Sequence, residues 1–162
     1  MALIGCSLGA FVAGTIATQE PRLAATVTVM GGSHLNSVIA TCDGKRATRV
    51  QATAERFGWG PEELEARLEP IMSVLDPANY PNRADPESVL IIDANRDKCV
   101  PEKSREDLWF ALGKPERISM NYDHAPAFYS MTPLGLSWMR RRFWEFLEAR
   151  LLEQPQSLPS SR

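Results

Sequence analysis

One short stretch near the N-terminus has the residues of a serine nucleophile. Gly5-Cys6-Ser7-Leu8-Gly9 reads G-x-S-x-G, a pattern that is typical of a sharp turn from a strand into a helix. In such a turn the flanking glycines avoid collisions with the strand and the helix, and the serine is held in a strained conformation above the sheet. The Ser7 hydroxyl would then be exposed, and the amide of Leu8 would point toward an oxyanion. The alternative is a chance match in a glycine-containing turn.

A serine hydroxyl needs a base, and the sequence has two histidines, His34 and His124. His124 follows a short predicted strand, in Asn121-Tyr122-Asp123-His124, and is expected to be the base. His34 follows another strand and could line the cleft, where it is expected to contact substrate or to make a loop hydrogen bond. Asp123 is expected to be a solvated loop acid.

Two aspartates compete for the role of the acid that orients the base. Asp93 stands at the end of an apolar run, and Asp97 follows it in the turn before Val100-Pro101. Ser7, Asp97 and His124 all come just after predicted parallel strands, whose carboxyl ends meet at one edge of a sheet. The chain order is Ser, Asp, His, which is the order of the α/β type of triad.

Short apolar runs alternate with helical patterns along the chain, and this alternation predicts a parallel sheet covered by helices. The predicted strands are 2–5, 24–30, 88–93 and 116–120, and the predicted helices are 8–18, 45–57, 61–75, 101–112 and 133–152. The fold class is therefore α/β, with about four parallel strands, helices on both faces and a small helical insertion over about 35–86. Residues 1–152 would form one domain, followed by a disordered tail over 153–162, which is rich in Pro and Ser.

Three large side chains in the predicted insertion are candidates for substrate contact. Trp59, Met72 and Tyr80 could line an acyl pocket if the insertion covers the cleft. The alternative, that they form the insertion's own small core, is given equal weight.

The elbow Gly5-Cys6-Ser7-Leu8-Gly9-Ala10 and the pattern Asp97-Lys98-Cys99-Val100-Pro101 together resemble the C-terminal half of an α/β-hydrolase of the esterase, dienelactone-hydrolase or acyl-thioesterase kind. The short loop with His124 and the closing helix complete the resemblance, which covers residues 1 to about 152. It implies that Ser7 is the nucleophile, Asp97 rather than Asp93 the acid, His124 the general base and Leu8 an oxyanion donor.

The resemblance also implies that upstream strands are missing. A complete enzyme of this type has several strands before the elbow, and a second oxyanion donor from an earlier loop, whereas only six residues precede Ser7. The strand at residues 1–5 would then be an exposed apolar edge. We expect it to pair with a second copy of the chain or with a separate N-terminal half.

The composition excludes several functional classes. The 162 residues include 44% hydrophobic and 23% charged residues, and the net charge is -2, which gives no basic excess for nucleic acid or for an anionic membrane. Three scattered cysteines, Cys6, Cys42 and Cys99, predict neither a disulfide framework nor a zinc site, and a reducing cytoplasm fits them best. We expect Cys6 to pack in the interior and Cys42 and Cys99 to be unpaired. No metal or other cofactor is expected, because two histidines and scattered cysteines offer no ligand cluster.

The sequence thus predicts hydrolysis of a carboxylic ester or thioester, a small-molecule substrate, through an acyl-enzyme. Two alternatives remain open. The chain could be a non-catalytic fragment or binding module, or the same triad could serve peptide hydrolysis or acyl transfer.

Overall fold

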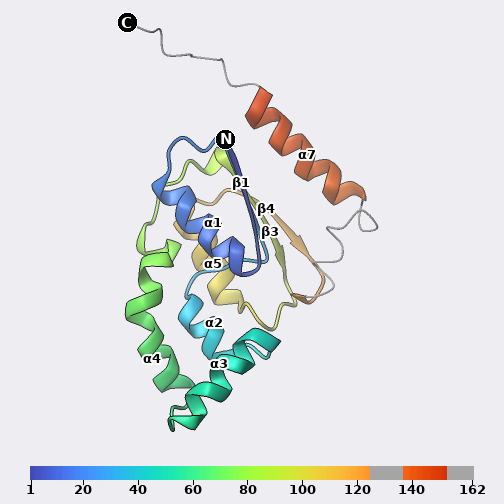
Figure 1. The fold of residues 1–162 in the computed structure, drawn as a ribbon. Helices are drawn as coiled ribbons and strands as arrows, with labels where there is room; N and C mark the ends of the chain where they lie inside the picture. The colour runs from blue at the N-terminus through green and yellow to red at the C-terminus, as the bar shows by residue number, and fades with distance from the viewer. Residues whose placement is uncertain (125–136, 153–162) are drawn as a thin grey trace, which may run out of the picture.

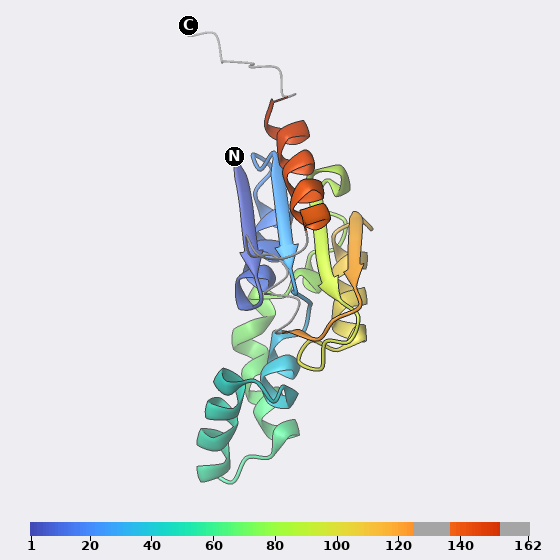
Figure 2. The same ribbon diagram turned by 90° about the vertical axis from the view of Figure 1, so that its right-hand side faces the viewer.

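A parallel sheet forms the centre of the computed structural model, which describes residues 1–124 and 137–152. The strands lie side by side in chain order and all run in the same direction, as Figure 1 and Figure 2 show together. They are β1 (Ala2–Cys6), β2 (Ala25–Val29), β3 (Val89–Ala94) and β4 (Glu116–Met120). The predicted α/β fold class is confirmed, and each strand lies within one residue of its predicted bounds.

Alternate side chains of the inner strands point to opposite faces of the sheet, as the strand period of two requires. Leu90 and Ile92 of β3 pack on one face with Met139 and Phe146 of α7 (Ser137–Leu152). The other face buries Ile91 against α1 (Leu8–Gln19) and α5 (Glu102–Ala111). Figure 2 shows α7 on one side of the strands and the other two helices behind them. Both faces are covered, which explains why β3 begins with the unbroken apolar run Val89-Leu90-Ile91-Ile92.

Helices that follow β2 lie beyond the carboxyl ends of the strands, at the lower end of the molecule in Figure 1. They are α2 (Leu35–Thr41), α3 (Lys45–Arg56) and α4 (Pro61–Met72), and 3-10 turns follow at Ser73–Leu75, Pro77–Asn79 and Pro86–Ser88. The two longer helices were predicted, and α2 was not. That these segments form a cap over a cleft stays a prediction.

The predicted last helix is confirmed from Ser137 to Leu152. Its first predicted residues, 133–136, and the predicted tail, 153–162, lie outside the described residues.

β1 forms one edge of the sheet, as predicted, and among the described strands it pairs only with β2. Apolar side chains are exposed on this edge: Ile4 is 53% exposed, and Met1 before the strand is also exposed. An open apolar edge is a site for association with another chain. Pairing of residues 1–5 with a second copy or with a separate N-terminal half remains a prediction.

Candidate active site

Ser7 occupies a strained turn between β1 and α1. Its backbone has φ 52° and ψ -120°, a conformation that a residue with a side chain rarely adopts, and its amide donates a hydrogen bond of 2.8 Å to the carbonyl of Val29. A Cβ atom on Gly5 would lie 2.1 Å from the Gly9 carbonyl oxygen, so the first glycine of the motif is required. A Cβ atom on Gly9 would meet no described atom within 4 Å, so the expectation that both glycines avoid collisions is wrong for the second.

A chain of hydrogen bonds joins three side chains beyond the carboxyl ends of the strands: Ser7 after β1, His124 after β4 and Asp97 after β3. Ser7 Oγ is 3.0 Å from His124 Nε2, and His124 Nδ1 is 2.6 Å from Asp97 Oδ2. With the ring proton on Nδ1, the imidazole donates to the carboxylate and accepts from the serine hydroxyl. Residues 117 apart in the chain thus meet with the geometry of a nucleophile, a base and an orienting acid.

The Asp97 carboxylate is fixed by the loop that carries it. Its Oδ1 accepts hydrogen bonds from the amides of Cys99 (2.8 Å) and Val100 (3.0 Å), which leaves Oδ2 facing His124. The side chain is 1% exposed. The two backbone amides hold Oδ1 of Asp97, and Oδ2 faces the His124 ring. The carboxylate is therefore oriented before any substrate binds.

Asp93, the competing acid, is engaged elsewhere. It is buried, and its Oδ2 accepts from Arg117 Nε at 2.7 Å. Asp93 therefore has a hydrogen-bonding role with Arg117 and does not face His124.

The pKa of His124 is raised above its ordinary value. The hydrogen bond to Asp97 is the largest cause, while partial burial of the ring acts in the opposite direction. The nearby charges of Asp97 and Asp123 add to the increase. A carboxylate that stabilises the protonated ring is what a base needs when it takes a proton from a hydroxyl.

Asp123 joins the two loops that carry Asp97 and His124. Its Oδ1 accepts from the His124 amide at 2.7 Å and from the Lys98 amide at 3.4 Å. These hydrogen bonds, led by that of His124, lower the pKa of the Asp123 carboxyl. Asp123 is partly exposed, as expected of a loop acid. Its hydrogen bonds between the two loops were not expected.

The N-terminus of α1 faces the same region as the Ser7 hydroxyl. Leu8 is the first residue of α1, and its amide has no acceptor among the described residues. Free amides at a helix N-terminus favour a negative charge. The predicted oxyanion donor is therefore available for a ligand.

An open hollow of about 410 Å³ adjoins Ser7, and its walls are mainly apolar. Its lining comes from β1, the elbow, α1 and the first turn of α3: Leu3, Cys6, Ser7, Leu8, Gly9, Val12, Ala13, Ile16 and Arg46. Cys6 also packs against the core on the α7 side, as expected.

Comparisons with known proteins identify the fold. No protein-family profile matches the sequence, and no curated protein does. Solved structures do match: an esterase of Pyrococcus furiosus (TM-score 0.55, 18% identity, 92% of this chain and 53% of that chain) and the acetyl xylan esterase of Paenibacillus sp. R4 (0.58, 19%, 93% and 45%). The acylaminoacyl peptidase of Pyrococcus horikoshii matches with TM-score 0.61 and 17% identity over 97% of this chain and 25% of its own.

These matches span nearly the whole chain with TM-scores above 0.5. The chain has part of an α/β-hydrolase fold. It spans about half the length of the two esterases and a quarter of the peptidase.

The substrate-contact residues predicted in the insertion do not line the hollow beside Ser7. Trp59 packs with Leu64 in a small cluster between α2, α3 and α4, and Arg67 lies over its ring. Met72 packs against the cluster around Phe11. The Tyr80 hydroxyl donates a hydrogen bond of 3.4 Å to the Val74 carbonyl. The contacts of Trp59 favour the alternative that was left open, a core within the helical segment, whereas Met72 packs on a cluster that also includes Phe11 of α1 and Val100.

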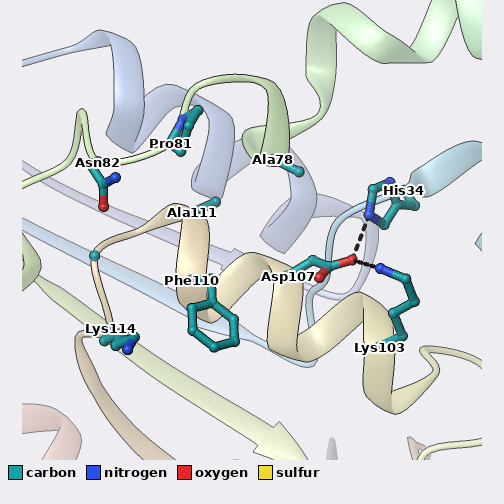
Figure 3. A pocket seen from close by; sticks show the side chains of 10 residues that line it. His34, Ala78, Pro81, Asn82, Lys103, Asp107, Phe110, Ala111 and Lys114 are labelled. Carbon is teal, nitrogen blue, oxygen red and sulfur yellow. Dashed lines mark hydrogen bonds and ion pairs between the residues drawn. The ribbon is translucent and has the colours of Figure 1, made fainter.

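His34 is not among the residues that line the hollow beside Ser7. Its Nε2 is 2.7 Å from Asp107 Oδ2, and Lys103 Nζ is 2.5 Å from the same oxygen (Figure 3). Its Nδ1 lies 3.1 Å from Asp76. This is the loop hydrogen bonding that was one of its two expected roles, and His34 is not brought to Ser7.

Sequence reasoning missed most of the residues that line the hollow, among them Val12, Ile16 and Arg46. Leu8, Val12 and Ile16 recur every four residues, which places them in one row on α1, and this spacing was the available signal. Nothing in the sequence placed Arg46 near Ser7, because that depends on how α3 packs.

The expectation that Cys42 and Cys99 are unpaired is wrong, because they form a disulfide across 57 residues. The end of α2 and the loop after β3 meet only in the folded chain, so cysteine spacing does not reveal the pair. A disulfide is typical of oxidising compartments, so the cysteines no longer support a reducing cytoplasm.

Two further findings concern the described residues. None of their helices is both long and apolar enough to cross a membrane. Within the same ranges, no group of three or more His, Cys, Asp or Glu side chains could hold a metal ion.

Proposed function

We propose that this protein is a serine hydrolase that cleaves a carboxylic ester or thioester through an acyl-enzyme. The observation that carries the proposal is the chain of contacts from Ser7 Oγ to His124 (3.0 Å) and from His124 to Asp97 (2.6 Å) in a strained strand-to-helix turn. Esterases among the structural neighbours support the same reaction class.

Each residue has a distinct task in this reaction. His124 Nε2 takes the proton of the Ser7 hydroxyl as Oγ attacks the carbonyl carbon, and Asp97 stabilises the imidazolium that forms. The Leu8 amide donates to the oxygen that becomes negative. His124 then protonates the leaving group, and a water molecule, activated by the same ring, releases the acid.

The apolar hollow beside Ser7 would hold the acyl part of the substrate. Leu3, Leu8, Val12 and Ile16 supply apolar contact area, and Arg46 is the one charged side chain of the described lining. An uncharged acyl chain is therefore the substrate portion that this surface fits best.

Pre-steady-state kinetics test the proposal. With a p-nitrophenyl ester of a short acyl chain, we expect a burst of nitrophenolate equal to the protein concentration, followed by slower steady turnover, because acylation by an ester with a good leaving group is much faster than deacylation. An amide of the same acyl group tests the second candidate, peptide hydrolysis, which the peptidase neighbour favours. No burst and no turnover with either compound would leave the non-catalytic alternative.

The pH dependence of the reaction follows from the raised pKa of His124. Only the neutral ring accepts the serine proton, so kcat/KM should rise with pH through a midpoint above 6.5, the ordinary value of a histidine. Asp123→Asn removes a negative charge that favours the protonated ring of His124, so this variant should have a lower midpoint. Asp43→Asn, at an exposed position, serves as a control that should leave it unchanged. A midpoint at or below 6.5 in the unsubstituted protein would contradict the assignment of His124 as the base.

A further inference from the structure

The loop that carries Asp97 also carries one end of the disulfide. The Cys99 amide donates to Asp97 Oδ1 at 2.8 Å, while the other carboxylate oxygen faces His124. The position of residue 99 therefore helps to set the direction of the acid. The Cys99 sulfur is bonded to Cys42.

The Cys42 end of the disulfide is fixed by its surroundings. Cys42 ends α2, is 2% exposed and packs with Phe11 and Val38. Gln51 Nε2 of α3 donates to its carbonyl at 2.9 Å, and the Gly44 amide donates to its sulfur at 3.2 Å. The Cys42 end of the bridge is thus held by α2, α3 and the core.

Other contacts of the Asp97 loop lie before and after residue 99. The Asn95 and Arg96 amides donate to backbone carbonyls of Met120 and Tyr122, and Arg105 donates to the carbonyl of Val100. Between these points, the contact of the exposed Lys98 amide with Asp123 is long, at 3.4 Å. The covalent bond at Cys99 is the strongest constraint on this part of the loop.

We propose that the Cys42–Cys99 disulfide is a positioning element of the active site, which holds the Cys99 amide where it orients the Asp97 carboxylate toward His124. This inference rests on the proposed function. It adds that full activity requires the oxidised form and that a dithiol reductant lowers turnover.

Reduction by a dithiol proceeds in two balanced steps. A reductant thiolate attacks the partly buried Cys99 sulfur, the S–S bond breaks and Cys42 leaves as a thiolate that takes up a proton. The second thiol of the reductant then displaces Cys99, so two protein thiols form and the reductant is oxidised to a cyclic disulfide. The count of thiols in the denatured protein should rise from one, Cys6, to three.

The test compares oxidised protein, dithiothreitol-reduced protein and the double variant Cys42→Ala/Cys99→Ala. We expect reduction and the double variant to lower kcat about 10- to 100-fold, the scale of a misplacement of about 1 Å in a catalytic group. The double variant should no longer respond to the reductant. KM should change little, since neither cysteine lines the hollow beside Ser7.

Two measurements separate positioning from a general loss of stability. Leu64→Ala removes a buried side chain from the cluster around Trp59, and at temperatures where it is folded it should keep its kcat. The NMR titration of the His124 ring needs no activity, and its pKa should fall on reduction as the Asp97 hydrogen bond weakens. A fully reduced protein with unchanged kcat and an unchanged His124 pKa would overturn the proposal, as would an equal loss of kcat in Leu64→Ala.

The same titration separates failure of the inference from failure of the proposed function. If the oxidised protein hydrolyses no ester, the proposed function fails. A fall of the His124 pKa on reduction would still support the positioning role of the disulfide, and a constant pKa would overturn it.

Discussion

Replacing Ser7 by alanine is expected to remove both the nitrophenolate burst and steady ester hydrolysis, with a loss in kcat of about 10⁶-fold or down to background. Losses of this size follow removal of the nucleophile from a serine triad. Among the described residues, Ser7 Oγ is the hydroxyl that His124 Nε2 contacts. Stopped-flow and steady-state assays of the two proteins measure the change. A Ser7→Ala protein that retains a tenth of the activity would show that another residue is the nucleophile.

Ser7→Gly is the informative companion variant. The backbone at residue 7 has φ 52° and ψ -120°, which glycine adopts without strain and alanine does not. Ser7→Gly should therefore unfold at a higher temperature than Ser7→Ala, with a gain of about 1–2 kcal/mol in the free energy of unfolding. Both variants should be inactive. Equal stability of the two would argue that the turn is not strained.

Asp97→Asn is expected to lower kcat about 10⁴-fold while the fold is kept. The side-chain oxygen of the asparagine can still accept from the amides of Cys99 and Val100, so its NH₂ group would face His124 Nδ1. The ring would then carry its proton on Nε2, which faces Ser7, and could not accept the serine proton.

Asp43→Asn is again the matched control, since it removes the same charge from an exposed site and should leave kcat unchanged. Circular dichroism confirms that both variants fold. A loss below tenfold in Asp97→Asn would assign the acid to another residue, and Asp93→Asn would then be the variant to measure.

The candidate triad was predictable because each of its members follows a predicted strand, and the strands before Ser7 and Asp97 contain short apolar runs. Val89-Leu90-Ile91-Ile92 is uncharged and largely β-branched, so the position of Asp97 just beyond the carboxyl end of the sheet follows from local sequence. The elbow was predictable from the glycine at residue 5. The turn requires this glycine because a Cβ atom there has no room.

Features that depend on contacts between distant segments were not predictable. The Cys42–Cys99 bond joins residues 57 apart, and no spacing rule links the end of a seven-residue helix to a loop after a later strand. The choice between pocket and core for Trp59 depends on how α2, α3 and α4 pack together. The loop-bridging role of Asp123 depends on the approach of Lys98, which the pattern of residues around His124 does not show.

The most direct test of the account is the intact mass of the protein after treatment with a fluorophosphonate, which reacts with serines that have an adjacent base. We expect a single phosphonyl adduct on the unsubstituted protein, located by peptide mapping to Ser7, and no adduct on Ser7→Ala. Equal labelling of the two proteins, or an adduct at another residue, would contradict the claim that Ser7, His124 and Asp97 form a working triad.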